Sequence, residues 1–340
     1  MDTIIITHAA EFADEARAEL GAALSGAQGR PLALGVTAVS VPDAREAAES
    51  LREATPIFIR HIVAATHEVA LDGPPEARLA AILGLVAEVC GTTECARDAV
   101  GVQIRVMDGT ASGPTRAELW QRLAPTVEPL FQLNTRTPST VLSVIVSETH
   151  AWVALNETAL NLSAWAGGAR HFAHGASEVS RAGFKLEEAL ELFGVALRPG
   201  TQAADLGAAP GGWTAVLARA GLKVDAIDPA RLDPRVLAMP GVRHHRCRTD
   251  RYATDAAPGS LDIIVNDMRI DALEAADLLI ELAPCLASGA DVITTLKLPK
   301  RGMVLAMSAA LARMERSFTV QMVRHLFHNR SEVTAWLKKR

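Results

Sequence analysis

The segment from Asp205 to Thr214 joins an apolar strand to a glycine-rich turn that opens a helix. Glycines let the backbone approach a ligand closely, and the first N–H groups of a helix point toward it. The turn could therefore cradle a nucleotide, although it lacks the Lys-Ser/Thr pair of a P-loop and the spacing of a dinucleotide-binding fingerprint. Asp228 follows about twenty residues later at the end of a second apolar strand, where a carboxylate can accept ribose hydroxyls. A helix cap or a turn is the alternative role for Asp228.

Lysine is scarce in this chain, with six lysines against 28 arginines. An arginine cannot lose its proton in a protein, whereas a lysine that is desolvated or crowded by other cations can. Lys185 and Lys297 are therefore candidates for proton chemistry. The alternative is that two of six lysines occupy these places by chance.

The chain has 340 residues, of which 49% are hydrophobic and 21% charged, so it can form two or three globular domains. It contains no apolar run of roughly 18 residues, as a membrane span needs, and its N-terminus lacks the features of a signal peptide. We expect a cytoplasmic protein. The cysteines show no metal-ligand spacing, so we expect no metal site and interpret them as buried apolar residues. They are Cys90, Cys95, Cys247 and Cys285.

Charge is divided unevenly along the chain. Residues 1–176 contain 12 arginines, no lysine and 20 acidic residues, a net charge of −8. Residues 177–340 contain 22 basic and 19 acidic residues, a net charge of +3. The C-terminal half is therefore the better candidate for binding a polyanion.

Two α+β modules are predicted in the first half, over residues 1–58 and 59–175. For the first module, the expected strands are Thr3–Thr7 and Leu32–Val41, and the expected helices are Ala9–Ala23 and Asp43–Ala54. For the second, we expect strands at His61–Val69 and Val100–Met107, helices at Pro75–Cys90 and Ala117–Leu130, and a hairpin of Leu142–Ile145 with Trp152–Leu155.

Gly167, Gly168 and Gly175 mark the main boundary, after which strands and helices alternate as in a parallel sheet. The expected strands are Ala203–Leu206, Val224–Ile227, Leu261–Val265, Asp291–Leu296, Phe318–Val323 and Val333–Leu337. The expected helices are Leu186–Phe193, Gly212–Ala220, Leu273–Ala283 and Met303–Arg313. Residues at the carboxyl ends of such strands converge on one crevice.

Five segments of this half form an ordered set: Ser180–Glu188, Asp205–Trp213, Val265–Met268, Leu296–Pro299 and Arg330–Val333. In order and spacing they resemble the FtsJ/RrmJ-like ribose 2′-O-methyltransferases. Five ordered matches are more specific than any single one, and they cover roughly residues 178 to 340. The resemblance implies a Rossmann-like class I methyltransferase domain over residues 176–340, with a mostly parallel sheet, an antiparallel last strand and S-adenosylmethionine as cofactor.

The resemblance also implies a catalytic tetrad of Lys185, Asp267, Lys297 and Glu332, in which the lysine matching Lys297 is taken as the base. Asp250 matches the adenine side of the cofactor, although a surface ion pair is an alternative for it. The full set that matches cofactor contacts is Gly207, Ala209, Pro210, Gly211, Gly212, Trp213, Asp228, Asp250 and Asp267.

The tetrad suits a poor nucleophile such as a ribose hydroxyl, which needs in-line placement and a route for its proton. Two neighbouring ammonium groups lower each other's pKa, whereas neighbouring carboxylates raise the pKa of a lysine. We therefore expect Asp267 and Glu332 to orient the reactive lysine and the four groups to titrate together.

By size and order, the first half resembles that of family members that methylate a cytidine ribose in large-subunit (23S) rRNA. These carry a ferredoxin-like module and then a THUMP-like RNA-binding domain. The implied partner is 23S rRNA or a precursor large subunit, bound by a monomer without membrane contact. A local cluster of Arg105, Arg116, Arg122 and Arg136 could offer one positive face in the acidic half. The expected phosphate contacts of the C-terminal half are Lys300, Arg301, Arg313, Arg316, Arg324, Arg330 and 338–340.

Two other functions compete with this one. An RNA-binding ribosome assembly factor with a methyltransferase fold and little activity would not need lysine rather than arginine at two site positions. A methyltransferase for small molecules or proteins is disfavoured because the tetrad suits an unactivated hydroxyl.

Overall fold

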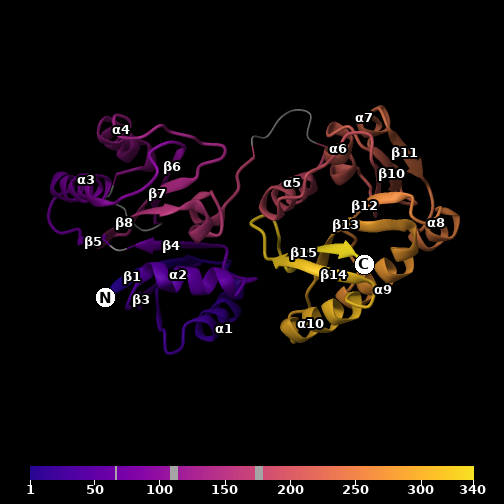
Figure 1. Ribbon diagram of the computed structural model, residues 1–340, viewed down its shortest axis with the longest axis horizontal. Helices are drawn as coiled ribbons and strands as arrows, with labels where there is room; N and C mark the ends of the chain where they lie inside the picture. Colours follow the sequence, from indigo (N-terminus) through magenta and orange to yellow (C-terminus); the bar gives the residue numbers. More distant parts are fainter. Residues whose placement is uncertain (66, 108–113, 173–178) are drawn as a thin grey trace. The chain divides into compact units, whose positions relative to one another are not determined.

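The computed structural model describes residues 1–65, 67–107, 114–172 and 179–340 (Figure 1). The chain divides into two units, Met1–Arg170 and His171–Arg340. The predicted boundary glycines Gly167 and Gly168 lie at the end of the first unit, and Gly175 lies outside the described residues.

The first sheet of the N-terminal unit has the strand order β2-β3-β1-β4, and every neighbouring pair is antiparallel. Its strands are β1 (Asp2–Thr7), β2 (Gly29–Ala33), β3 (Val36–Val41) and β4 (His61–Ala65). Its helices are α1 (Ala13–Ala23), preceded by the 3-10 turn η1 (Ala10–Phe12), and α2 (Ala44–Glu53). Because β4 pairs with β1, this sheet extends beyond residue 58, where the first module was expected to end.

The second sheet has the order β5-β8-β7-β6. Its strands are β5 (His67–Ala70), β6 (Val100–Val106), β7 (Thr140–Val146) and β8 (His150–Glu157), with helices α3 (Pro75–Thr92) and α4 (Arg116–Val127) and the 3-10 turns η2 (Thr158–Asn161) and η3 (Ala166–Gly168). The predicted hairpin is confirmed, since β7 and β8 pair antiparallel. The single strand expected at His61–Val69 is wrong, because β4 and β5 belong to different sheets.

The C-terminal unit is built on a seven-stranded sheet of order β11-β10-β9-β12-β13-β15-β14. Its strands are β9 (Gln202–Leu206), β10 (Lys223–Ile227), β11 (Val242–His245), β12 (Leu261–Asn266), β13 (Leu286–Lys297), β14 (Phe318–Arg324) and β15 (Glu332–Lys339). The first five strands in the order are parallel, and β15 runs antiparallel to β13 and β14. The expected mostly parallel sheet with an antiparallel last strand is therefore confirmed.

The helices of this unit are α5 (Ala182–Phe193), α6 (Gly212–Arg219), α7 (Pro234–Leu237), α8 (Thr249–Asp255), α9 (Ala272–Leu282) and α10 (Met303–Met314), with the 3-10 turn η4 (Ala283–Cys285). Apolar residues of α5 and α6, such as Leu186, Phe193 and Leu217, share one core with Val224 and Val265 of the sheet. This packing fixes α5 against the strands whose ends carry the expected site residues.

The burial of the cysteines and the length of the helices bear on two expectations from the sequence. Cys90 and Cys285 are buried as expected, whereas Cys95 and Cys247 are partly exposed. None of the helices in the described ranges is long and apolar enough to span a membrane.

Candidate active site

The four tetrad residues meet at the edge of the C-terminal sheet formed by the carboxyl ends of its parallel strands. The strand order reverses between β9 and β12. Ligand crevices form at such switch points, outside the carboxyl ends of the strands. Asp267 directly follows β12, and Lys297 is the last residue of β13. Glu332 begins the antiparallel strand β15 and pairs in register with Lys297, so it reaches the same edge.

Lys185 projects from the first turns of α5 and is only 7% exposed. Its Nζ lies 2.9 Å from both carboxylate oxygens of Asp267 and 2.8 Å from Oε1 of Glu332. Lys297 Nζ donates to Asp267 Oδ1 at 2.7 Å and lies 3.9 Å from Glu332 Oε2. The resemblance therefore selected four side chains that form one connected network of alternating charge.

Burial disfavours the charged form of three of these groups, but their partners outweigh it. Burial lowers the pKa of Lys185, yet the nearby carboxylates of Asp267 and Glu332 leave it above its ordinary value. Burial also raises the pKa of both acids, yet the attraction of Lys185 and Lys297 brings each below its ordinary value. The two carboxylates therefore favour the charged form of Lys185, which makes it a poorer candidate for proton chemistry than the sequence alone indicated.

Two residues that sequence reasoning missed hold Asp267 in place. The hydroxyl of buried Thr295, on β13, donates to Asp267 Oδ1 at 2.8 Å. Asn266 is fully buried; its Oδ1 accepts the Met268 N–H at 3.0 Å, which shapes the turn that carries Asp267. Both residues lie inside segments singled out as strands or motifs, but nothing in their spacing distinguishes them from core residues.

The glycine-rich loop between β9 and α6 contains the matched residues Gly207, Ala209, Pro210, Gly211 and Gly212. Gly207 has a φ of +69°, and a Cβ there would lie 2.5 Å from Cγ of Met268. Gly211 has a φ of +114° and precedes α6, whose N-terminus has no side-chain cap. The loop therefore lies beside the Asp267 turn and leaves helix N–H groups available for an anionic ligand.

Asp228, at the end of β10, accepts the N–H of Ala209 at 3.0 Å and the N–H of Ala230 at 2.8 Å. It thus forms the turn considered as an alternative and also supports the glycine loop. Asp250 lies in the first turn of α8, with its side chain 61% exposed and 3.7 Å from Arg248 Nε. The surface ion pair considered for Asp250 is present, and its contact with a cofactor stays a prediction.

Trp213 is 3% exposed, and its indole N–H donates to the carbonyl of Ala182 at 2.7 Å. Its side chain therefore fastens α6 to α5. Asp205 is equally buried; burial raises its pKa to about 7, although the Thr214 hydroxyl donates to it at 2.6 Å and opposes the shift.

The expected phosphate contacts separate into two groups. Lys300 and Arg301 follow the Lys297 strand, Arg330 precedes Glu332, and all three are exposed. Arg324 is buried, so it was wrong as a phosphate contact. Arg313 pairs with Asp277 but keeps 43% of its side chain exposed, so its contact with phosphate stays a prediction.

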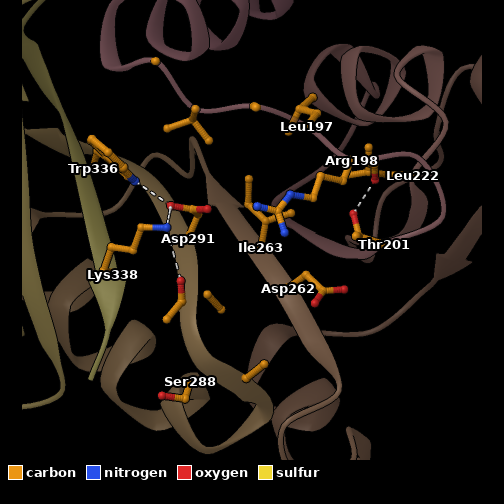
Figure 2. A pocket seen from close by; sticks show the side chains of 16 residues that line it. Leu197, Arg198, Thr201, Leu222, Asp262, Ile263, Ser288, Asp291, Trp336 and Lys338 are labelled. Carbon is orange, nitrogen blue, oxygen red and sulfur yellow. Dashed lines mark hydrogen bonds and ion pairs between the residues drawn. The ribbon is translucent and has the colours of Figure 1, made fainter.

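Lys338 lies in a pocket at the other end of the sheet (Figure 2). Thr201 and Leu222 in this pocket precede β9 and β10, and Asp262 lies near the start of β12, so they mark the amino ends of the parallel strands. Asp291 accepts the Trp336 indole N–H at 2.7 Å and lies 2.9 Å from Lys338 Nζ, as Figure 2 shows. Lys338 is therefore paired and remote from the tetrad.

A seven-stranded sheet of this order, with a glycine loop and an acidic residue at its switch point, defines an α/β methyltransferase fold. Residues 178–334 match the family model described as FtsJ-like methyltransferase. The C-terminal unit of this chain is therefore similar to FtsJ-like methyltransferases over these residues.

Relatives of this domain are named ribosomal RNA large subunit methyltransferase M. The protein from Laribacter hongkongensis (strain HLHK9) is 38% identical over 175 residues, which cover 47% of this chain and 48% of the relative. That from Xylella fastidiosa (strain M12) is 38% identical over 168 residues, covering 46% of each chain. The match thus spans about half the length of these relatives. Among solved structures, TrmN from Thermus thermophilus aligns over 100% of both chains at 15% identity with a TM-score of 0.39.

Proposed function

We propose that this protein transfers a methyl group from S-adenosylmethionine to a ribose 2′-hydroxyl of large-subunit (23S) rRNA, at a cytidine. The observation that carries the proposal is the Lys-Asp-Lys-Glu network at the switch point, beside the glycine loop. The relatives named as large-subunit rRNA methyltransferases support the choice of substrate.

The residues around the glycine loop fit S-adenosylmethionine by their donors and acceptors. The uncapped N-terminus of α6 offers N–H groups to the carboxylate of the methionine moiety. Each oxygen of Asp228 accepts one backbone N–H and keeps a lone pair for the hydroxyls of the cofactor ribose. When bound, the cofactor supplies a methyl group activated by its sulfonium charge.

The proton of the attacking hydroxyl goes to Nζ of Lys297 in this proposal. The Lys297 side chain is 24% exposed and can reach a substrate, whereas that of Lys185 is 9% exposed and fully engaged by carboxylates. Lys297 must be neutral when it acts, and Asp267 Oδ1 at 2.7 Å orients the amine. Lys185 keeps its charge throughout, so it holds Asp267 and Glu332 ionised and in place.

Exposed cations lie within four residues of a tetrad residue in the sequence and suit the phosphates of RNA. These side chains form no ion pair with another described residue: Arg181, Arg269, Lys300, Arg301 and Arg330. We further propose that the N-terminal unit contains a ferredoxin-like module followed by a THUMP-like domain. The antiparallel order β4-β1-β3-β2 with two helices supports the former, and in this proposal the module includes β4.

The proposal is tested by incubating the purified full chain with S-adenosylmethionine labelled on its methyl group and large-subunit rRNA, either deproteinised or in precursor particles. We expect label at one ribose, detected as an alkali-resistant linkage and mapped to a cytidine. Label on a base would reject 2′-O transfer. Binding of rRNA without transfer would favour the assembly-factor alternative.

Lys297→Arg tests the proposed base. Arginine keeps the charge but cannot accept a proton, so methyl transfer should fall by about 10²- to 10⁴-fold. Folding and binding of S-adenosylmethionine should remain. Lys300→Arg is the matched control, because an exposed lysine that contributes only charge tolerates the change. Near-normal turnover of Lys297→Arg would exclude Lys297 as the base.

A further inference from the structure

Glu188 is a buried carboxylate outside the tetrad, and its hydrogen-bond partners among the described residues lie in one short segment. It is 1% exposed and lies on α5 three residues after Lys185, so the two side chains share one side of the helix. Oε1 of Glu188 accepts the Phe327 N–H at 2.7 Å, and Oε2 accepts the His328 N–H at 3.0 Å. Nδ1 of His328 lies 2.6 Å from Oε2. Burying a carboxylate is unfavourable unless its oxygens are bonded, so these contacts fix where the segment lies.

Phe327 and His328 belong to the connection between β14 and β15, which ends at the tetrad residue Glu332. Further bonds make this connection rigid. Asn329 accepts the Leu326 N–H at 2.8 Å, and its Nδ2 donates to Thr334 Oγ1 at 3.1 Å. A displacement at Phe327 and His328 is therefore transmitted toward the start of β15.

The same connection is tied to the Lys297 strand. The N–H of Leu298 donates to the carbonyl of Ser331 at 2.9 Å, next to the pair formed by Lys297 and Glu332. Helix α5 thus holds the connection at two points. Lys185 binds the Glu332 carboxylate, and Glu188 binds the backbone five residues before it.

We propose that Glu188 is a positioning residue for methyl transfer, acting through His328 and the connection to Glu332; this rests on the proposed function. Without the Glu188 carboxylate, Glu332 loses its fixed place relative to Lys185 and Lys297. Misplacement by about 1 Å can reduce a rate by about 10²-fold. The glycine loop contributes none of the contacts described for Glu188, so cofactor binding should not depend on it.

The test compares Glu188→Gln with Glu187→Gln in the full chain. Glu187 is the neighbouring residue, its side chain is 28% exposed, and it pairs with Arg219 at 3.6 Å. For Glu188→Gln we expect kcat on rRNA to fall by about 10- to 100-fold. KM for rRNA and the Kd for S-adenosylmethionine should stay at wild-type values. Amide hydrogen exchange of residues 325–332 should become faster, and the control should match wild type in every measurement.

His328→Ala is the second variant. It removes the imidazole contact but leaves the two backbone bonds to Glu188, so it should give the same pattern with a smaller loss of kcat. It decides the matter if Glu188→Gln does not fold.

Three results would overturn the positioning role. The first is an unchanged kcat. The second is a loss of kcat that is accompanied by equal losses of cofactor affinity and Tm. The third is a loss of kcat without faster amide hydrogen exchange at residues 325–332. A wild-type protein that methylates no rRNA would instead refute the proposed function, and the positioning role would fall with it.

Discussion

Replacing Lys185 by methionine should destabilise the C-terminal unit strongly at neutral pH. The ammonium contacts three carboxylate oxygens at 2.8 to 2.9 Å, and its side chain is 9% exposed. Methionine fills about the same volume but carries no charge, so among the described residues Asp267 and Glu332 would keep Lys297 as their cationic partner. Removing one partner of a buried ion pair costs about 3–5 kcal/mol of unfolding free energy, and the three short contacts suggest the upper part of that range.

The pH dependence of this loss follows from the three pKa shifts. Lys185 has a raised pKa, so its contribution is present below its ordinary value of 10.5 and lost above it. Asp267 and Glu332 have lowered pKa values, so their contribution is present above their ordinary values of 3.8 and 4.5 and lost as pH falls further. Without Lys185 both acids bind protons more readily, so the difference between variant and wild type should shrink between neutral pH and pH 4.5.

The assay is calorimetric unfolding of the full chain at a series of pH values, following the transition of the C-terminal unit. Lys223→Met is the control, because Lys223 is exposed at the start of β10 and its loss should cost less than about 0.5 kcal/mol. A loss below 1 kcal/mol for Lys185→Met at neutral pH, or one that does not vary with pH, would refute the reasoning.

Two further variants test the glycine loop and the strand that leads to it. Gly207→Ala adds a Cβ that meets Met268 at 2.5 Å, so it should weaken cofactor binding and slow methyl transfer. Gly259 also has a positive φ, of 65°, but has open space around it. Gly259→Ala should therefore lower only the unfolding free energy, by the backbone cost of about 1–2 kcal/mol. Equal kinetics in both variants would contradict the steric argument. Asp205→Asn removes a carboxyl whose pKa is raised from 3.8 to about 7, so wild type loses stability as pH rises through that interval and the variant does not. Urea denaturation at pH 5 and pH 8 should show the variant gaining relative to wild type at the higher pH, and a constant difference would contradict this.

The sequence predicted the strands of the C-terminal sheet best where they are apolar and central. β11 was missed because Val242–His245 is short, polar and at the edge of the sheet. The predicted start of α5 at Leu186 was too late. Lys185 is polar and Gly183 is a weak helix former, so the pattern excluded them, but tertiary packing buries both residues within the helix. For the site, family spacing selected the tetrad, but it could not select Thr295, Asn266 or Glu188. Their roles depend on which segments meet in space, and a single sequence does not contain that information.

The contacts of Lys185 and Lys297 give a different reason for lysine at each position. The sequence offered one reason for both, which was the capacity of lysine to lose a proton. An ammonium group has three donors that point in different directions, and Lys185 Nζ contacts three oxygens from two carboxylates. A planar guanidinium directs its donors in one plane and suits a single carboxylate, so arginine would not reproduce this arrangement. At position 185, geometry alone therefore favours lysine over arginine. Lys297 has one short contact with Asp267 and a longer one with Glu332, so geometry does not demand lysine there. At position 297 the capacity to lose a proton is the property that distinguishes lysine from arginine. For this reason we assign the base that accepts the hydroxyl proton to Lys297.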